Sequence, residues 1–219
     1  MSELAASAAE WVKLGTCAVS DAADRLGLPA ALLGLRPVSA NRPFAGRAVT
    51  VRLGPADGSR PARHLCTAAV DAAAEGDVIV IANDGRVDAA AWGGLLSLGA
   101  AMRGVAGVVI DGACRDIDEA VEMELPVYAR MPVMRTARGR VMELSWGEPV
   151  VVCGTEVRTG DLILADGSGV VAVSAADAGR VLAAARDVAG RESRIAASVR
   201  AGMALSEAMG ADYEKLRGA

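Results

Sequence analysis

The chain has 219 residues, of which 53% are hydrophobic and only 3% aromatic, and its 27 acidic and 23 basic residues give a net charge of -4. This length fits one domain or two, and Ala, Val and Leu are abundant enough to fill a core. The interspersed charges form no basic stripe that would neutralise phosphates, so nucleic acid is not an expected partner.

The first two thirds of the chain alternate between helical and strand-like segments. Residues 19–26 have helical spacing, with Ser20 as the expected N-cap and Gly27 as the end. Strands are expected at residues 46–53, 78–81, 108–110 and 127–129, and helices at 65–72, 94–103 and 116–124. This order predicts a partly parallel sheet covered by helices.

From Arg140 onwards the pattern changes to short strands separated by glycine-containing turns. Strands are expected at residues 141–144, 150–152, 156–157, 162–164 and 170–173. Asp166-Gly167-Ser168-Gly169 predicts a hairpin turn, because it lacks the spacing of a dinucleotide fingerprint or a P-loop. Ser174 and Asp177 have capping-box spacing and open a long Ala-rich helix. A second, β-rich sheet and a sheet–sheet–helix layering are therefore expected.

The cysteines and the single histidine indicate neither a zinc site nor a disulfide framework. The four cysteines are far apart, at positions 17, 66, 114 and 153, without a Cys-x-x-Cys pair. Cys114 precedes an arginine and could be a nucleophile, but no local base accompanies it and a packing role is favoured. His64 is expected in a helix, with a structural role.

The N-terminus, beginning Met1-Ser2-Glu3-Leu4, lacks the basic-then-apolar pattern of a secretion signal. The longest uncharged apolar stretch, residues 89–102, is shorter than the roughly 20 residues of a membrane-spanning helix and contains three glycines. We therefore expect a soluble, cytoplasmic protein without a membrane partner.

The most informative motif is Gly112-Ala113-Cys114-Arg115-Asp116, which follows an apolar run at residues 107–111. It places a guanidinium and a carboxylate where a strand gives way to a helix, and small molecules bind beyond the carboxyl ends of strands in α/β folds. Arg115 could bind an anion and Asp116 a divalent cation, although an Asp here could also simply complement the helix dipole. A second junction, Trp92-Gly93-Gly94-Leu95-Leu96, offers main-chain N–H groups for a carboxylate. Together they suggest a metal-assisted enzyme acting on a small keto acid.

These motifs, in this order, resemble those of the family of 4-hydroxy-4-methyl-2-oxoglutarate aldolases and regulator-of-ribonuclease-activity-A-like (RraA-like) proteins. Further segments that carry the resemblance are Val19–Ala22, Ala45–Val51, Glu75–Ile81, Arg158–Asp161 and Asp166–Val171. The resemblance implies an α/β, swivelling β/β/α layered fold: a partly parallel sheet, a second β-rich sheet and a C-terminal helix. It also implies a single domain over residues 1–219, with helical extensions at 1–18 and 186–219.

The activity that the resemblance implies is that of a class II, divalent-metal-dependent lyase. Such an enzyme cleaves a 4-hydroxy-2-oxo acid to pyruvate and decarboxylates oxaloacetate, through an enolate stabilised by Mg²⁺ or Mn²⁺. The chain itself disfavours a lysine-dependent aldolase, because Lys13 and Lys215 are its only lysines.

Carried over by position, the family's substrate contacts and metal ligand fall on the two motifs. Main-chain N–H groups of Gly93, Gly94, Leu95 and Leu96 would bind the substrate together with the Arg115 side chain. Asp116 would hold the metal, and Arg115 and Asp116 are the expected catalytic residues.

One departure from the family concerns Gly94, where members with aldolase activity commonly carry an acidic residue. A further ligand for the metal-bound water must then come from elsewhere, and the C-terminal helix offers Asp187, Glu192 and Glu207. Of these, Glu192 corresponds to a carboxylate donated by an adjacent subunit, although flanking arginines also suit a solvated helix face. The resemblance thus implies a cyclic trimer, or a hexamer formed from two trimers, with active sites between subunits.

Two alternatives to the lyase remain open. One is a non-catalytic, RraA-like regulator that binds an RNA-processing protein, and the other is a different metal-dependent reaction on an oxo acid. The regulatory branch tends to lose the Asp after the Arg, whereas Asp116 is present here.

Overall fold

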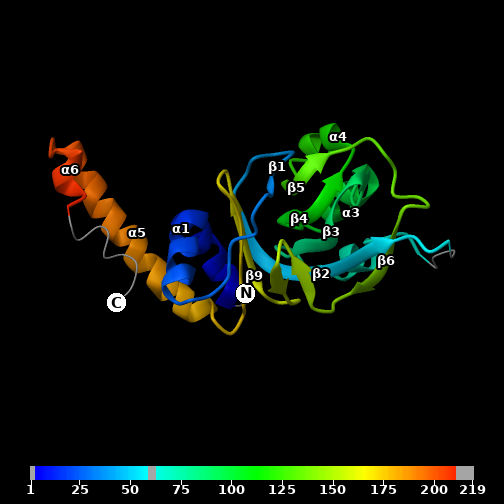
Figure 1. The fold of residues 1–219 in the computed structure, drawn as a ribbon, viewed down its shortest axis with the longest axis horizontal. Helices are drawn as coiled ribbons and strands as arrows, with labels where there is room; N and C mark the ends of the chain where they lie inside the picture. The colour runs from blue at the N-terminus through cyan, green and yellow to red at the C-terminus, as the bar shows by residue number, and fades with distance from the viewer. Residues whose placement is uncertain (1–2, 59–62, 211–219) are drawn as a thin grey trace.

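The structure, a computed structural model, describes residues 3–58 and 63–210. Within these residues the chain folds around one large mixed sheet (Figure 1). Its strands are β1 (Arg36–Pro37), β2 (Phe44–Pro55), β3 (Val78–Ala90), β4 (Gly107–Cys114), β5 (Val127–Pro132), β6 (Val141–Trp146), β9 (Leu162–Asp166) and β10 (Gly169–Val173). They lie in the order β1-β5-β4-β3-β2-β9-β10, and β6 pairs with β2 beside that path.

The central strands β2, β3, β4 and β5 are parallel, as the alternation of elements predicted. They are connected by the short helices α2 (Thr67–Ala72), α3 (Gly94–Met102) and α4 (Ile117–Glu122). Every residue of β4 is buried, because a parallel strand covered on both faces has no polar side, and this explains its apolar run. Strands β3 and β4 lead into α3 and α4 at the same edge of the sheet.

The N-terminal helix is longer than the sequence predicted. Helix α1 (Glu3–Arg25) contains a break at Gly15, where φ is 81° and ψ is 161°. The prediction of Ser20 as an N-cap was wrong, because Asp166 of β9 caps the second segment one turn earlier. Its carboxylate accepts hydrogen bonds from the N–H of Thr16 at 2.8 Å and from the Thr16 hydroxyl at 2.7 Å. The predicted end is confirmed, since Gly27 has a left-handed φ of 69°.

These contacts also set the ionisation of Asp166. Burial alone would raise the pKa of Asp166, but the hydrogen bonds donated by Thr16, Ser168 and Gly169 together lower it. The capping carboxylate is therefore held in its charged form.

The expected second sheet is present but small, formed by β7 (Val150–Val152) and β8 (Thr155–Val157). The other late strands join the large sheet, because β6 and β9 both pair antiparallel with the long strand β2, and β10 pairs with β9. Asp166 pairs with Gly169 across a two-residue loop, which confirms the predicted hairpin turn.

The C-terminal part is helical, with α5 (Ala178–Arg200) followed by the short α6 (Leu205–Ala208). The N–H of Asp177 donates to the hydroxyl of Ser174 at 3.1 Å, the contact that the capping-box spacing predicted. The helix does not open at Ser174, however, because α5 begins only at Ala178 with Asp177 as its N-cap. The first half of α5 buries Val181, Ala185 and Val188, while its second half projects beyond the sheet (Figure 1). The expected α/β class is thus confirmed. None of the described helices is long and apolar enough to span a bilayer.

Candidate functional site

The turn that leads into α3 is fixed by a buried tryptophan. The indole N–H of Trp92 donates to Ser97 Oγ at 2.9 Å, and both side chains are buried. Ser97 in turn donates to the carbonyl of Gly93, from its N–H at 3.0 Å and from its hydroxyl at 3.3 Å. The main chain of Gly93 and Gly94 is therefore preorganised at the start of the helix.

Arg115 and Asp116 lie against this turn, at the end of β4. The N–H of Arg115 donates to the carbonyl of Trp92 at 3.0 Å, which ties the two motifs together. Asp116 Oδ2 accepts hydrogen bonds from the N–H of Gly94 at 3.0 Å and from Nε of Arg115 at 3.1 Å. Asp116 stands at the N-cap of α4, yet its side chain makes no capping hydrogen bond to that helix. Its carboxylate is directed to the α3 junction instead.

The backbone of Asp116 supports the same interpretation. Its φ of 56° and ψ of 45° lie in the left-handed region, which costs a non-glycine residue on the order of 1 kcal/mol. Strain of this kind persists where the surrounding structure enforces it, often at functional sites.

Charged side chains lie close to both glycines of the turn. A Cβ on Gly93 would lie 2.8 Å from Asp116 Oδ2. A Cβ on Gly94 would overlap Oε2 of Glu119, so the Glu119 carboxylate occupies the space that a side chain at position 94 would need. The carboxylate absent from residue 94 is thus replaced in space by one from α4.

These residues line a pocket of about 720 Å³. The structure brings together there all of the expected residues of the two motifs, which are Gly93, Gly94, Leu95, Leu96, Arg115 and Asp116. Side chains that sequence reasoning did not place in a site also line it, namely His64, Thr67, Glu119, Thr136 and Arg138. The prediction that His64 lies in a helix was wrong, because α2 begins only at Thr67 and His64 is exposed at the pocket.

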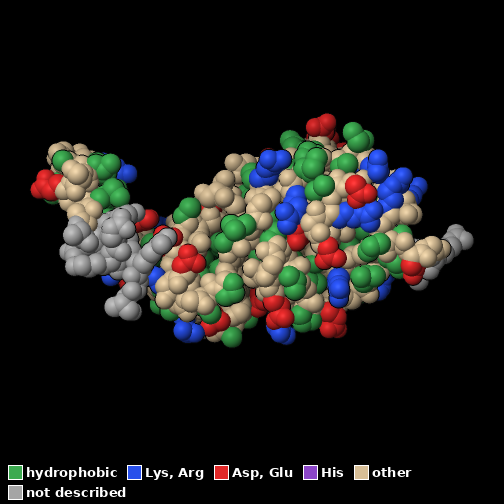
Figure 2. Space-filling model, in the orientation of Figure 1, with side chains coloured by type: hydrophobic (Ala, Val, Ile, Leu, Met, Phe, Trp, Pro, Cys, Tyr) green, Lys and Arg blue, Asp and Glu red, His purple; other side chains and the backbone are tan. Residues whose placement is uncertain are grey.

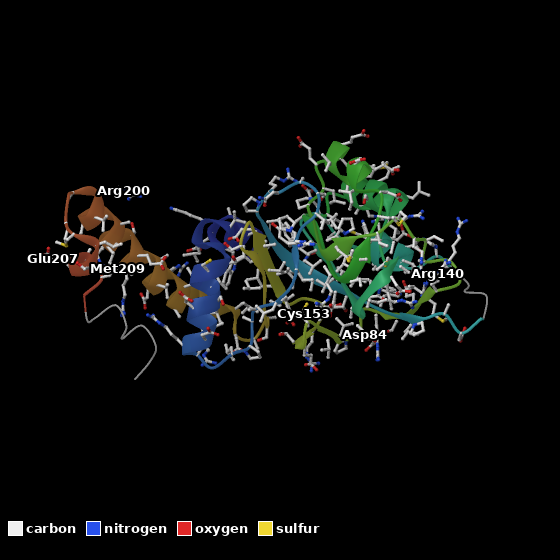
Figure 3. All side chains as sticks on the ribbon, turned by 45° about the horizontal axis from the view of Figure 1, so that its top comes forward. Asp84, Arg140, Cys153, Arg200, Glu207 and Met209 are labelled. Carbon is white, nitrogen blue, oxygen red and sulfur yellow. The ribbon has the colours of Figure 1, made fainter. Side chains whose placement is uncertain are left out.

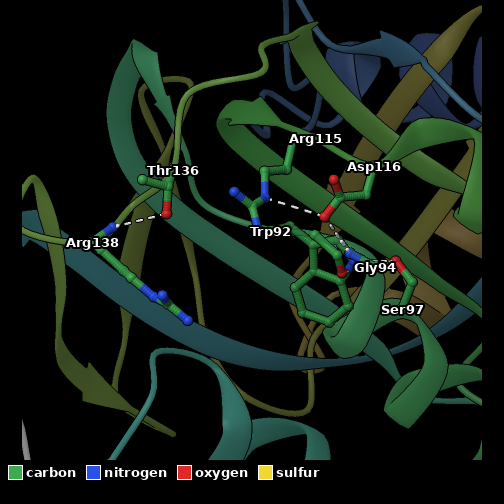
Figure 4. Close-up of polar contacts among 8 residues, drawn as sticks. Trp92, Gly94, Ser97, Arg115, Asp116, Thr136 and Arg138 are labelled. Atoms are coloured by element: carbon green, nitrogen blue, oxygen red, sulfur yellow. Dashed lines mark hydrogen bonds and ion pairs between the residues drawn. The ribbon is translucent and has the colours of Figure 1, made fainter.

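Arg138, on the loop between β5 and β6, also lines the pocket and is exposed at its edge (Figure 4). The guanidinium of Arg140 donates to the carbonyls of Thr136 at 3.4 Å and Arg138 at 3.3 Å, and Arg86 donates to the Arg140 carbonyl at 2.7 Å. These hydrogen bonds stabilise the conformation of the loop. Among the described residues no hydrogen bond or ion pair engages the Arg138 guanidinium. Figure 2 shows basic side chains gathered over this loop, and they are arginines, since neither lysine of the chain lies in it. The sequence signal for Arg138 was its place in the loop that follows β5, a strand parallel to β4.

Cys114 is not a nucleophile in this arrangement. It is fully buried at the end of β4, and desolvation raises the pKa of its thiol to about 12. The favoured packing role agrees with this environment. All four cysteines are free.

The carboxylates at the pocket are Asp116 and Glu119. No group of three or more His, Cys, Asp or Glu side chains among residues 3–58 and 63–210 could hold a metal ion. Mg²⁺ is commonly bound through one or two carboxylates with water in its remaining positions, so Asp116 with water fits such an ion.

Glu192 does not join the pocket within one chain. It lies exposed in the second half of α5 and is absent from the pocket lining. Figure 3 places Glu207, at the end of that helical arm, at the opposite end of the molecule from Arg140. A contribution from Glu192 therefore requires an adjacent subunit. Lys215 lies outside the described residues.

Comparisons with known proteins place these features in a family. A family model described as "RraA-like: Aldolase/RraA" matches residues 16–172. A Halalkalibacterium halodurans protein named "Putative 4-hydroxy-4-methyl-2-oxoglutarate aldolase" is 31% identical over 202 residues, which cover 89% of this chain and 90% of that protein. Protein DlpA of Legionella pneumophila is 29% identical over 164 residues, which cover 75% of this chain but only 27% of DlpA.

Solved structures agree with the family match. An uncharacterized protein from Pseudomonas syringae has a TM-score of 0.81 and 31% identity, covering 92% of this chain and 97% of that one. Streptomyces coelicolor RraAS2 is described as an unusual member of the RNase ES inhibitor RraA protein family. It has a TM-score of 0.73 and 22% identity, and the match covers 84% of this chain and 94% of that one. At that identity, the likeness to RraAS2 concerns the fold alone.

Proposed function

Because this chain belongs to the RraA-like (Aldolase/RraA) family, we propose that it is a divalent-metal-dependent lyase, which cleaves a 4-hydroxy-2-oxo acid to pyruvate and also decarboxylates oxaloacetate. The observation that carries the proposal is the convergence of Arg115, Asp116 and the start of α3 in one pocket. Each of the three supplies something that the reaction of an oxo acid needs.

Arg115 binds the acid and neutralises the charge that develops on it. Among residues 3–58 and 63–210, only Nε of its guanidinium is engaged, by Asp116, so both terminal nitrogens remain for the substrate. A planar guanidinium can donate to a carboxylate and a keto oxygen at once. The N–H groups of Leu95 and Leu96, in the first turn of α3, have no acceptor within the helix and add donors for a carboxylate.

Asp116 holds the divalent cation, Mg²⁺ or Mn²⁺, through one carboxylate and water. When bound, the cation stabilises the negative charge that the breaking carbon–carbon bond leaves on the pyruvate oxygen. Asp116 is oriented for this role by Gly94 and Arg115, which fix one carboxylate oxygen.

Arg138 favours a substrate with a second carboxylate, such as 4-hydroxy-4-methyl-2-oxoglutarate. It is a permanent cation lining the same pocket as Arg115, and no anionic side chain among the described residues is bonded to its guanidinium. The pocket thus carries one cation for each end of a dicarboxylate.

A pyruvate-release assay tests the proposal directly. A panel of 4-hydroxy-2-oxo acids and oxaloacetate is incubated with the protein, in excess chelator and then with Mg²⁺ or Mn²⁺ restored. We expect release that chelator abolishes and metal restores, since a single carboxylate ligand binds weakly. Full turnover in excess chelator would refute the metal-dependent mechanism, and release of another product would favour a different reaction on an oxo acid.

A regulatory role is the second candidate, favoured by exposed apolar side chains on α3. Leu95 is 87% and Met102 81% exposed, and Leu98 lies partly exposed between them. Such a stripe suits a protein contact, and RraAS2 is described as a member of a family of RNase inhibitors. Absence of turnover on every acid of the panel, together with inhibition of an RNA-processing nuclease, would favour this function.

The same stripe favours self-assembly. We propose a homotrimer or hexamer in which a neighbouring subunit covers α3 and contributes Glu192 to the pocket. The second half of α5, which carries Glu192, projects away from its own sheet, as a contact with another copy requires (Figure 1).

A further inference from the structure

The two reactions of the proposed function differ in one chemical requirement. Cleaving a 4-hydroxy-2-oxo acid needs a group that removes the proton of the 4-hydroxyl, whereas decarboxylating oxaloacetate needs no such base. Asp116 is poorly suited to this role, because the proposed function commits its carboxylate to the cation and its Oδ2 also accepts from Gly94 and Arg115. The pocket must hold the base elsewhere.

Glu119 is the other carboxylate that lines the pocket. It lies in the first turn of α4, three residues after Asp116, and its Oε2 occupies the position that a Cβ on Gly94 would take. Any larger residue at position 94 would displace it. The glycine therefore brings the Glu119 carboxylate over the start of α3, beside the main chain that Asp116 also contacts.

The carboxylate of Glu119 is free to accept a proton. No hydrogen bond or ion pair engages it among residues 3–58 and 63–210, whereas other pocket groups such as Asp116 and Trp92 are committed. His64 also lines the pocket, but no hydrogen bond or ion pair within the described part of the chain ties it to Gly94 or to the Arg115–Asp116 pair.

We propose that Glu119 is the proton acceptor of the carbon–carbon cleavage, an inference that rests on the proposed lyase function. The 4-hydroxyl proton passes to a Glu119 oxygen as the C3–C4 bond breaks and C4 becomes a carbonyl. The electron pair of that bond moves into the enolate, whose oxygen Arg115 faces. Protonation of the enolate at C3 then yields pyruvate, and Glu119 can return its proton in this step.

The test compares both reactions in Glu119→Gln. This variant keeps the size of the side chain but removes its ability to accept a proton. We expect kcat for cleavage of the 4-hydroxy-2-oxo acid to fall about 100-fold or more, and kcat for oxaloacetate decarboxylation to stay within about two-fold of the unmodified protein. Mn²⁺ affinity, measured by the electron paramagnetic resonance of free Mn²⁺, should be unchanged.

Asp118→Asn is the matched control. Asp118 is an exposed carboxylate in the same first turn of α4 but does not line the pocket. Asp118→Asn therefore removes one negative charge from the start of the helix, as Glu119→Gln does, and reproduces any effect on the helix dipole. Both reactions should continue in this variant.

The outcomes separate the possible roles. Parallel loss of both reactions with weaker Mn²⁺ binding in Glu119→Gln would show that Glu119 holds the cation, and unchanged cleavage would remove it from the reaction. Either result overturns the inference. An unmodified protein that performs neither reaction would instead refute the proposed function.

Discussion

Arg115→Lys probes whether the geometry of the guanidinium, and not only its charge, serves the reaction. In the structure Nε of Arg115 bonds to Asp116 at 3.1 Å, so the two terminal nitrogens are left for the substrate. A lysine has one nitrogen, which cannot contact Asp116 and reach both substrate oxygens. The variant should therefore lose at least one charge-assisted hydrogen bond to the reacting acid.

Such a bond contributes about 1.5–3 kcal/mol, which corresponds to a loss of about ten- to 150-fold in kcat/KM. We expect Arg115→Lys to be nearly as impaired as Arg115→Ala in pyruvate release. Folding should be little affected, because the ion pair with Asp116 is about one third exposed on both sides. Thermal unfolding of both variants checks this. Retention of most of the unmodified kcat/KM by the lysine variant would refute the bidentate role of Arg115.

The remaining predictions concern the far end of the pocket, the α1 cap and the assembly. Arg138→Gln should raise KM for a dicarboxylic 4-hydroxy-2-oxo acid about ten- to 100-fold but leave 4-hydroxy-2-oxopentanoate unaffected. Arg135→Gln is its control in the same loop, and an equal rise for both acids would contradict the assignment. Asp166→Asn should cost about 1–2 kcal/mol of stability, or about 2–8 °C in Tm, because the bonds to Thr16 lose their charge. Folding lowers the pKa of Asp166, so the stability difference between this variant and the unmodified protein should be complete above the ordinary carboxyl pKa. The difference should vanish as the pH falls through the lowered pKa, and a stability difference independent of pH would argue against a charged cap. Mixing Arg115→Ala with Glu192→Ala subunits should regenerate activity, and a fully active monomer would rule out a shared site.

Most of the parallel part of the sheet, strands β2 to β5, could be predicted because the sequence patterns that indicate it are local. The apolar runs at residues 78–81 and 107–110 and the helical spacing between them reflect burial that any parallel strand requires. The meeting of Trp92–Leu96 with Arg115 and Asp116 followed from the same topology, since parallel strands end at one edge.

The remaining features depend on contacts between distant segments. Asp166 caps the segment that begins at Thr16 across a separation of 150 residues, and no periodicity near Ser20 reveals it. An exposed Glu119 in the first turn of a helix is ordinary in sequence, and only the missing side chain of Gly94 makes it part of the pocket. The position of Arg138 at the pocket likewise depends on the path of the loop between β5 and β6, which its local sequence does not indicate.

The long strand β2 has a consequence for how the molecule can move. Its first residues, Phe44–Arg47, pair with β9, and the following residues, Ala48–Arg52, pair with β3 beside the pocket. One continuous strand is therefore common to the region that carries α1 and to the region that carries Arg115. Two bodies that share a strand cannot hinge apart without breaking its hydrogen bonds, so we expect slow amide exchange in β2, β3 and β9 to be governed by one global opening. Rearrangement around a ligand is then left to the loops at the strand ends, above all the segment that carries Arg138.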